Sequence, residues 1–241
     1  MNSLTIATPF YNEQEGLDNY FATIEKIYNL LDDKIKIKFL FIEDGSTDET
    51  KEKLFEYKQN NPNHDIKIHC HEKNSGYGQT LINSIKLADT EYLITYDSDC
   101  TYDYKIIDTL VDTIRSEQYD IINVSYKLFD KVNKLGTIKA ILSWGGSFIY
   151  KIFFSEIKNY NIKVFTCSFR IYNLRKIKNI NLISKDFNSC SELMVRAMMK
   201  KLKIIEIPGE NIGRKFGYSK MKIIKNIYNT LKTIFIIKIK D

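Results

Sequence analysis

The segment from Tyr96 to Asp103, YDSDCTYD, places three carboxylates directly after the apolar run Tyr92–Thr95. Asp97 and Asp99 are two residues apart, so on an extended backbone they point to the same side and their oxygens can bind one hard divalent cation. The pattern also suits an acidic surface turn, because aspartate side chains bond nearby backbone amides. As D-x-D-x-T, it also matches the nucleophile of a phosphatase. The segment alone leaves these three interpretations open.

The whole chain has the composition of a globular protein. Its 241 residues, 44% of them hydrophobic, suffice for one large domain or one domain with an appendage. The four cysteines lie far apart without a C-x-x-C pair, so we expect neither a zinc site nor disulfides, as in a reducing cytoplasm. No basic and apolar leader is present, and no apolar run reaches about 18 residues, so we expect neither secretion nor a membrane-spanning helix.

Charge is distributed unevenly between the two halves. Residues 1–120 contain 12 Lys and Arg against 23 Asp and Glu, whereas residues 121–241 contain 24 against 7. The first half therefore carries a net charge of −11 and the second +17. A basic half favours binding to an anionic partner, such as lipid headgroups, a phosphorylated substrate or nucleic acid. The alternative is a lysine-rich solvated surface.

Short apolar runs alternate with longer amphipathic segments in the first half. This alternation predicts an α/β fold, in which a mainly parallel sheet carries helices on both faces. The predicted strands are Leu4–Thr8, Ile37–Ile42, Ile66–Cys70, Tyr92–Tyr96 and Ile121–Ser125. The predicted helices are Glu13–Leu31, Asp48–Gln59, Tyr77–Leu87 and Tyr104–Arg115.

Polar clusters follow the first four predicted strands. In open α/β sheets, ligands bind at the carboxyl ends of the strands, so these clusters should share one rim. They are PFYNE at Pro9–Glu13, EDGSTDE at Glu43–Glu49, NSGYG at Asn74–Gly78 and DSD at Asp97–Asp99. Residues Ser46–Glu49 also suit a helix N-cap and the glycines of NSGYG a tight turn, but neither explains Asp44 at a strand end.

The second half has fewer regular elements. Helices are predicted over Lys134–Phe154 and Ser191–Lys201, and strands over Val164–Cys167 and Ile204–Ile207. From Ser219 onward, apolar residues recur at helical spacing among lysines, which predicts a basic amphipathic helix. Such a helix can cover the core or lie on an anionic membrane surface.

Taken in order, PFYNE, EDGSTDET, NSGYG and YDSDCTYD resemble the nucleotide-sugar-binding half of family-2 glycosyltransferases of the GT-A fold, a Rossmann-like architecture. The resemblance implies that the nucleoside pocket is lined by Pro9, Tyr11, Glu13 and Asp44, with Lys73 and Gly76 close to it. It also implies that Asp97 and Asp99 hold Mg²⁺ or Mn²⁺ on the diphosphate of a UDP- or GDP-sugar, Asp99 more directly. Carboxylate oxygens suit these cations, which neutralise the charge of the departing nucleoside diphosphate.

Motifs of the second half resemble the polyprenyl-phosphate (dolichyl-phosphate) hexose synthases of that family. They are SFRIY at Ser168–Tyr172, the E-L-x-x-R pattern that begins at Glu192, and RKFGYSK at Arg214–Lys220. The resemblance implies that an acceptor phosphate is held by Arg170, Arg214, Ser219 and Lys220, and that the catalytic residues are Asp99, Arg170, Arg214, Lys220 and Glu192. One departure is Lys163–Cys167, which lacks the aspartate usually found shortly before the S-F-R element.

One absence, at the position of the catalytic base, fits the resemblance to polyprenyl-phosphate hexose synthases. Family-2 enzymes that glycosylate hydroxyls usually carry an aspartate two residues before the acidic residue of E-L-x-x-R, where this chain has Cys190. A hydroxyl acceptor needs a base to remove its proton, whereas a lipid phosphate is already an anionic nucleophile. The absence therefore favours a polyprenyl phosphate acceptor. Glu192 can be a base or the partner of a basic neighbour.

Three other classes fit the sequence less well. A haloacid-dehalogenase-like phosphatase needs its D-x-D-x-T after the first strand and an acidic pair later, whereas DSDCT follows the fourth predicted strand. A dinucleotide-binding dehydrogenase needs G-x-G-x-x-G after its first strand, whereas the glycines of NSGYG follow the third predicted strand. A non-enzymatic membrane- or nucleic-acid-binding protein would use the basic half, but the sequence contains no recognisable nucleic-acid-reading element.

We therefore expect a metal-dependent, inverting hexosyltransferase in the cytoplasm, bound peripherally at the inner membrane face. Its acceptor is a polyprenyl phosphate or, alternatively, a saccharide hydroxyl, and nucleic acid is not a partner. The GT-A domain is expected over residues 1–215, with a nucleotide-sugar half at 1–120 and an acceptor half at 121–215, followed by the amphipathic helix at 216–241. Asp103 is expected to cap the helix that follows it.

Overall fold

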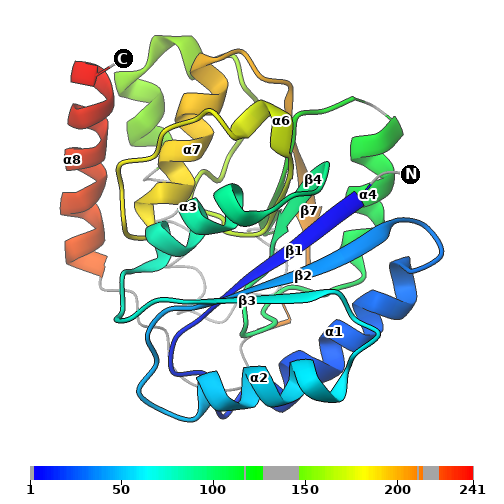
Figure 1. The fold of residues 1–241 in the computed structure, drawn as a ribbon. Helices are drawn as coiled ribbons and strands as arrows, with labels where there is room; N and C mark the ends of the chain where they lie inside the picture. Colours follow the sequence, from blue (N-terminus) through cyan, green and yellow to red (C-terminus); the bar gives the residue numbers. More distant parts are fainter. Residues whose placement is uncertain (1–2, 117, 127–146, 211, 214–222, 241) are drawn as a thin grey trace.

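One mainly parallel sheet runs through both halves of the chain and carries helices on both faces (Figure 1). The computed structural model describes residues 3–116, 118–126, 147–210, 212–213 and 223–240. The strand order is β3-β2-β1-β4-β6-β5-β7, and β6 runs antiparallel to its neighbours β4 and β5. The predicted α/β architecture is confirmed.

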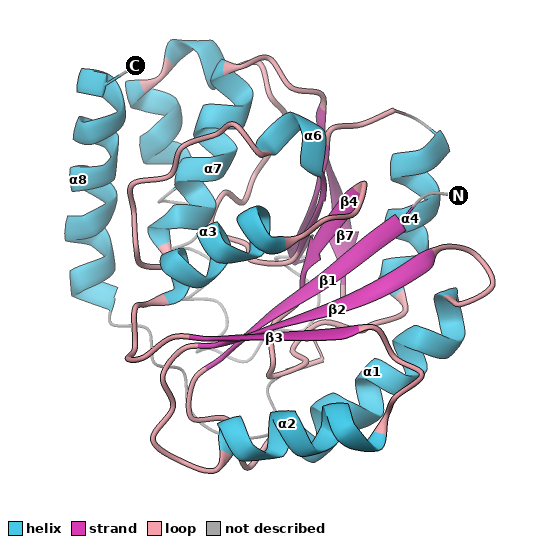
Figure 2. Cartoon of the chain, in the orientation of Figure 1, coloured by secondary structure: helices cyan, strands magenta, loops and turns pink. Residues whose placement is uncertain are grey.

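The strands and helices alternate along the first half and become less regular in the second (Figure 2). The strands are β1 (Ser3–Phe10), β2 (Lys36–Glu43), β3 (Ile66–Cys70), β4 (Tyr92–Thr95), β5 (Ile121–Tyr126), β6 (Arg170–Asn173) and β7 (Ile204–Gly209). The helices are α1 (Leu17–Leu31), α2 (Thr50–Asn60), α3 (Tyr77–Leu87), α4 (Ile106–Ser116), α6 (Leu174–Ile177), α7 (Asn188–Met199) and α8 (Ile223–Lys240), with a 3₁₀ turn η1 at Ser155–Ile157.

Apolar side chains fill a separate core on each face of the sheet. Leu4 and Ile6 of β1 are buried in the core that also contains residues of α1, α2 and α4. Ala7, which points to the opposite face, is buried in the core shared with α3, α7 and α8. Burial on both faces explains the apolar runs of β1, β2 and β4.

The first helix begins later than predicted. Periodicity predicted a start at Glu13, whereas α1 begins at Leu17. The backbone N–H of Asn12 donates to Ser46 Oγ at 3.1 Å, and that of Glu13 donates to Thr50 Oγ1 at 2.9 Å. Because side chains from the next βα loop take these donors, residues 12–14 form a loop over the rim of the sheet instead of a first helical turn.

The strand predicted at Val164–Cys167 is wrong, and the true strand of this region is β6. The backbone N–H of Val164 donates to Glu206 Oε2 at 3.0 Å, and that of Phe165 donates to Ser147 Oγ at 2.8 Å. Side chains thus satisfy backbone groups that a ladder would otherwise use. Of the helix predicted over Lys134–Phe154, residues 147–153 are helical, and residues 134–146 lie outside the described part of the chain.

The predicted C-terminal helix is present as α8, which lies along α7 at the edge of the molecule (Figure 1). Ile234 and Ile237 are 3% and 0% exposed and belong to the core beneath α3 and α7. Within the part of the chain that the structure describes, no helix is long and apolar enough to cross a membrane.

The segment before α7 crosses the first turn of α3 in backbone contact. The N–H of Gly78 donates to the carbonyl of Lys185 at 2.9 Å. A Cβ atom on Gly78 would lie 2.5 Å from the carbonyl carbon of Lys185, closer than real Cβ atoms approach. Gly76 has φ 88°, and its Cβ would lie 2.5 Å from the same carbonyl oxygen. Glycine is therefore needed here for close approach as well as for turning.

We expect Gly78→Ala to destabilise the protein by about 1–3 kcal/mol, because the added methyl group must displace the backbone at residues 184–185. Urea unfolding measures the change. Lys86→Ala, at an exposed position of the same helix, is the matched control and should change stability by less than about 0.5 kcal/mol. Helix propensity alone would make Gly78→Ala more stable than wild type. An increase in the free energy of unfolding would therefore contradict the close backbone contact at Gly78.

Candidate active site

A cavity of about 380 Å³ lies at the carboxyl ends of the parallel strands β1, β2 and β4. Its walls combine residues from all four predicted strand-end clusters with Thr80 of α3 and one residue of the second half. The lining residues are Pro9, Phe10, Tyr11, Glu13, Asp44, Asn74, Gly76, Tyr77, Thr80, Asp97, Ser98, Asp99 and Phe187. The structure thus brings together seven of the site residues proposed from sequence: Pro9, Tyr11, Glu13, Asp44, Gly76, Asp97 and Asp99. Lys73 is exposed in the adjoining loop and does not line the cavity.

Hydrogen bonds join the loops that follow β1 and β2. Asn12, with φ 50°, accepts at Oδ1 from the N–H of Thr47 at 2.8 Å, in addition to the bond that it donates to Ser46. The helix N-cap expected over Ser46–Glu49 is largely wrong, because α2 begins at Thr50 without a side-chain bond from its N-cap residue. Only Asp48 acts locally, accepting from Thr50 N at 3.0 Å. The cluster instead fixes the position of Tyr11 and Glu13 at the cavity.

Asp44 accepts hydrogen bonds from three donors of the next βα unit. Its oxygens lie 2.8 Å from Ser75 N, 3.0 Å from Gly76 N and 2.6 Å from His71 Nδ1. An ionised carboxylate only accepts, so Nδ1 of His71 carries the hydrogen. Nε2 of the same ring lies 2.7 Å from Nδ2 of Asn83 on α3. Asp44 is therefore held in one orientation at the cavity wall by a chain of contacts that reaches into α3.

The two carboxylates of the D-x-D segment are oriented differently. Asp97 Oδ2 accepts from Ser168 Oγ at 2.5 Å, which ties it to the residue that precedes β6 by two positions. Asp99 Oδ1 accepts from Thr101 N at 3.1 Å. Asp103 is not part of the cavity, and its Oδ1 accepts from Lys105 N at 3.1 Å. Because α4 begins at Ile106, this bond forms a turn before the helix and not the expected cap on one of its N–H groups.

Two carboxylates at one cavity wall suit a hard divalent cation. Among the described residues, no group of three or more His, Cys, Asp or Glu side chains could hold a metal by itself. A cation held by Asp97 and Asp99 would therefore need further oxygen ligands from a bound phosphate group or water, as Mg²⁺ usually has in nucleotide-binding sites. The donor set fits that use.

An aromatic pair forms another part of the cavity wall. The rings of Tyr77 and Phe187 stack with centroids 4.9 Å apart and an angle of 17° between their planes. Phe187 is 43% exposed and precedes α7. Tyr77 belongs to a predicted motif in which it had no expected role, and Phe187, His71 and Asn83 are not among the residues predicted for the site. NSGYG was a signal for Tyr77, but no local pattern marks Phe187, because only the contact of residues 184–185 with α3 brings it here.

Arg170 lies elsewhere than expected. It was predicted to hold an acceptor phosphate, but it is 0% exposed and does not line the cavity. Its guanidinium donates to Asn123 Oδ1 at 2.6 Å and to the carbonyls of Cys190 and Phe165 at 2.8 and 2.5 Å. A direct contact between Arg170 and an acceptor is therefore contradicted by its burial. The side chain instead joins the loop at Phe165 to the first turn of α7.

Glu192 and Cys190 are also buried on α7. Of the two interpretations of Glu192, the structure shows the pairing with a basic neighbour: Oε1 lies 2.9 Å from Arg196 Nε, and the backbone N–H groups of residues 183 and 184 donate to the same carboxylate. Burial raises the pKa of the Cys190 thiol to about 12, so this residue stays protonated at neutral pH and cannot replace the missing aspartate as a base. Arg214, Ser219 and Lys220 lie outside the described residues.

The family model described as Glycosyl transferase family 2 matches residues 5–180 of the chain. The protein belongs to this family. The match begins within β1, contains β2–β4 and all four strand-end clusters, and continues through β6. The resemblance that rested on the spacing of these clusters is therefore confirmed.

Curated relatives in the family act on different acceptors. The dolichol-phosphate mannosyltransferase of Pyrococcus furiosus is 24% identical over 232 residues, which cover 96% of this chain and 62% of that protein. The processive diacylglycerol beta-glycosyltransferase of Mycoplasma pneumoniae is 34% identical over 123 residues, or 50% of this chain and 35% of that protein. The chain thus spans less than two thirds of the length of either relative.

A solved structure shows the same fold. The glucosyl-3-phosphoglycerate synthase of Mycobacterium tuberculosis, in complex with Mn²⁺, UDP and glucosyl-3-phosphoglycerate, superposes with a TM-score of 0.70 at 11% identity over 97% of this chain and 77% of that one. At this identity the likeness concerns the fold, and it confirms the predicted GT-A architecture.

We expect His71→Ala to weaken nucleotide binding by about five- to thirtyfold, because Asp44 loses the donor that holds its carboxylate at the cavity wall. Isothermal titration with UDP and GDP measures the effect. His71→Asn can return an N–H near the position of Nδ1 and should recover most of the affinity.

His69→Ala is the matched control for this experiment. His69 lies on the same strand and 3.2 Å from Asn83, but Asp44 is hydrogen-bonded to His71. Equal losses in His69→Ala and His71→Ala, or no recovery in His71→Asn, would show that the effect comes from the strand and not from Asp44.

Proposed function

We propose that this family-2 protein is a metal-dependent, inverting hexosyltransferase that uses a UDP- or GDP-sugar and transfers the sugar to a polyprenyl phosphate at a membrane face. The observation that carries the proposal is the single cavity shared by the D-x-D carboxylates Asp97 and Asp99 and the strand-end residues of the expected nucleoside pocket. A diphosphate placed beside these carboxylates would have its nucleoside near Pro9, Tyr11 and Asp44.

In this proposal Asp97 and Asp99 hold Mg²⁺ or Mn²⁺, which neutralises the charge on the leaving diphosphate when bound. The hydrogen bond from Ser168 to Asp97 fixes the orientation of this carboxylate at the cavity. Glu13 and Gly76, with the aromatic Tyr77, complete the walls around the donor. The expected roles of Pro9, Tyr11, Glu13, Asp44, Gly76, Asp97 and Asp99 in donor binding are thus compatible with their positions.

The proposed acceptor, a polyprenyl phosphate, follows from the residues found where a catalytic base is usually located. Cys190 is a buried, neutral thiol, and Glu192 is fully enclosed by N–H donors, so neither is suited to deprotonate a hydroxyl. A lipid phosphate needs no deprotonation at neutral pH, only positioning and charge neutralisation. The name of the Pyrococcus relative points to the same acceptor class. Arg214, Ser219 and Lys220 remain the proposed phosphate ligands, now without Arg170.

We expect Asp99→Asn to lower kcat/KM by about 100-fold or more, because the amide binds the cation more weakly than a carboxylate and the leaving group loses charge stabilisation. The assay is steady-state turnover of UDP- and GDP-sugars over a Mn²⁺ titration, with the metal concentration for half-maximal rate shifted upward. Asp103→Asn, which removes a nearby carboxylate outside the cavity, is the matched control and should be near wild type. Unchanged turnover and metal requirement in Asp99→Asn would refute the metal assignment.

We expect sugar from a radiolabelled donor to enter an anionic, organic-extractable product when polyprenyl phosphate is supplied, because a phosphate acceptor keeps one negative charge after glycosylation. Anion-exchange chromatography of the extract separates this product from a neutral glycolipid. Label in a soluble saccharide would instead support the alternative acceptor, a saccharide hydroxyl, and label in a neutral glycolipid would support a lipid hydroxyl.

A further inference from the structure

Four large apolar side chains form a continuous exposed row on α8, here called the outer row: Tyr228, Leu231, Phe235 and Ile239. They are 68%, 49%, 66% and 66% exposed. Their spacing of three and four residues places them on one side of the helix. The opposite side carries the buried residues Thr233, Ile234 and Ile237. α8 is thus apolar on two opposite faces, and only one of them is covered by the protein core.

Two further exposed apolar side chains lie on the helical residues 147–153, next to α8. Ile152 and Phe153 there are 57% and 43% exposed. Lys238 Nζ lies 5.8 Å from the centre of the Phe153 ring, so this surface and α8 are adjacent. Exposed aromatic and aliphatic side chains gathered on two neighbouring helices exceed the scattered exposure expected of a solvated surface.

Lysines border the outer row, and α8 contains no acidic residue. Rotation by 100° per residue places Lys232 on one side of the row and Lys238 on the other. The helix sequence IIKNIYNTLKTIFIIKIK contains four lysines in all. An apolar row between lysines fits the boundary of an anionic bilayer, where the row enters the acyl region and the ammonium groups meet lipid phosphates. It fits a second copy of the chain poorly, because two such helices would bring lysines together without carboxylates to pair them.

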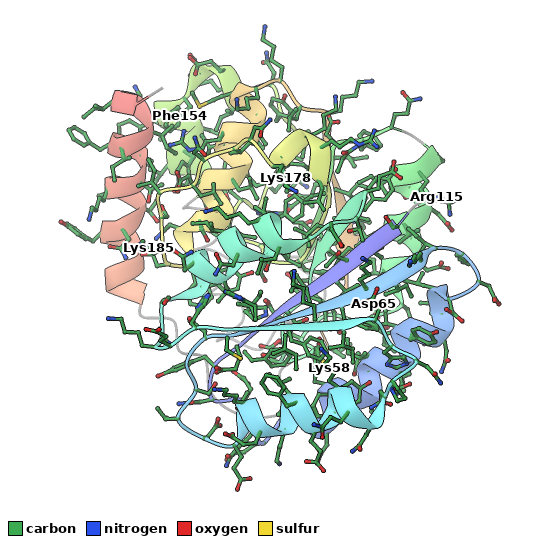
Figure 3. All side chains as sticks on the ribbon, viewed as in Figure 1. Lys58, Asp65, Arg115, Phe154, Lys178 and Lys185 are labelled. Carbon is green, nitrogen blue, oxygen red and sulfur yellow. The ribbon has the colours of Figure 1, made fainter. Side chains whose placement is uncertain are left out.

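Hydrogen bonds connect α8 to the wall of the active-site cavity. Ser184 Oγ lies 3.0 Å from Thr233 Oγ1, Thr230 Oγ1 donates to Asn188 Oδ1 at 2.7 Å, and Asn229 donates to Asp186. The bonded segment 184–188 contains Phe187 of the cavity wall and Lys185, whose carbonyl contacts α3. Lys185 is labelled in Figure 3. If α8 binds another surface, only the segment 184–188 separates that contact from the cavity.

We infer that the outer row of α8, together with Ile152 and Phe153, is a docking surface for an anionic lipid bilayer, with α8 lying in the plane of the membrane. Docking does not depend on glycosyl transfer. Its use, which is to present the cavity to an acceptor embedded in the membrane, rests on the proposed function.

The test is sedimentation of the full chain with vesicles, without donor sugar or metal. We expect the protein to bind vesicles of phosphatidylglycerol and phosphatidylcholine, to bind them less at high salt, and to bind pure phosphatidylcholine vesicles much more weakly. The double variant Phe235→Ser/Ile239→Ser should lose about tenfold or more of the partition, and Lys232→Glu/Lys238→Glu a similar factor on anionic vesicles. Thermal melting close to wild type would show that the variants are folded.

Matched controls come from α2 on the acidic half of the chain. Phe55→Ser removes an apolar side chain that is 41% exposed, and Lys58→Glu reverses an exposed lysine, and both should leave vesicle binding unchanged. The inference is overturned if wild type does not sediment with vesicles, if Phe235→Ser/Ile239→Ser binds like wild type, or if neutral vesicles bind equally well. A concentration-dependent dimer that the same variant abolishes, without vesicle binding, would assign the face to a second copy.

The failure of docking is distinguishable from failure of the proposed function. Thermal stabilisation by a UDP- or GDP-sugar with Mn²⁺ reports the cavity alone. Vesicle binding with no stabilisation by any nucleotide sugar would leave the docking surface intact and refute the donor assignment, whereas the reverse result would refute only the docking surface.

Discussion

The backbone contact between residues 184–185 and the first turn of α3 connects the parts of the molecule on which its chemistry depends. It needs glycine at 76 and 78, because a Cβ atom at either position would overlap the carbonyl group of Lys185. On one side, the contact places Phe187 against Tyr77 at the cavity. On the other, Ser184, Asp186 and Asn188 bind α8. The second half of the chain thus supplies part of the cavity wall beside NSGYG, and through residues 184–188 it also connects this wall to α8.

Charged residues inside the second half stabilise this arrangement. Arg170 and Glu192 are fully buried, and a buried charge is tolerated only where hydrogen bonds replace its hydration. Arg170 donates to two carbonyls and to Asn123, and Glu192 accepts from residues 183 and 184 and from Arg196. Both therefore orient irregular backbone next to the cavity without reaching it.

The C-terminal helix α8 covers the protein core with one face and leaves a second apolar face exposed. With 3.6 residues per turn, one face of α8 packs on α7 while the opposite face stays outside. The asymmetry of charge along the sequence has a matching arrangement in space. The helices α1 and α4, each with two acidic residues and one basic residue, lie on the other side of the sheet from α8, and Lys232 and Lys238 border the outer row.

Local pattern in the sequence was sufficient for the strands β1–β5, for α3, and for the shared rim on which Pro9, Asp44, Asp97 and Asp99 meet. Buried parallel strands make continuous apolar runs, and their carboxyl ends must lie on one edge, so chain order alone predicts these neighbours. Three features came only from the folded chain: β6 in place of a strand at Val164–Cys167, the burial of Arg170, and Phe187 and His71 at or behind the cavity wall. Each depends on contacts between residues distant in sequence. The residue type does not distinguish an arginine that binds a phosphate from one that binds buried carbonyls. Only the contacts in the folded protein distinguish them.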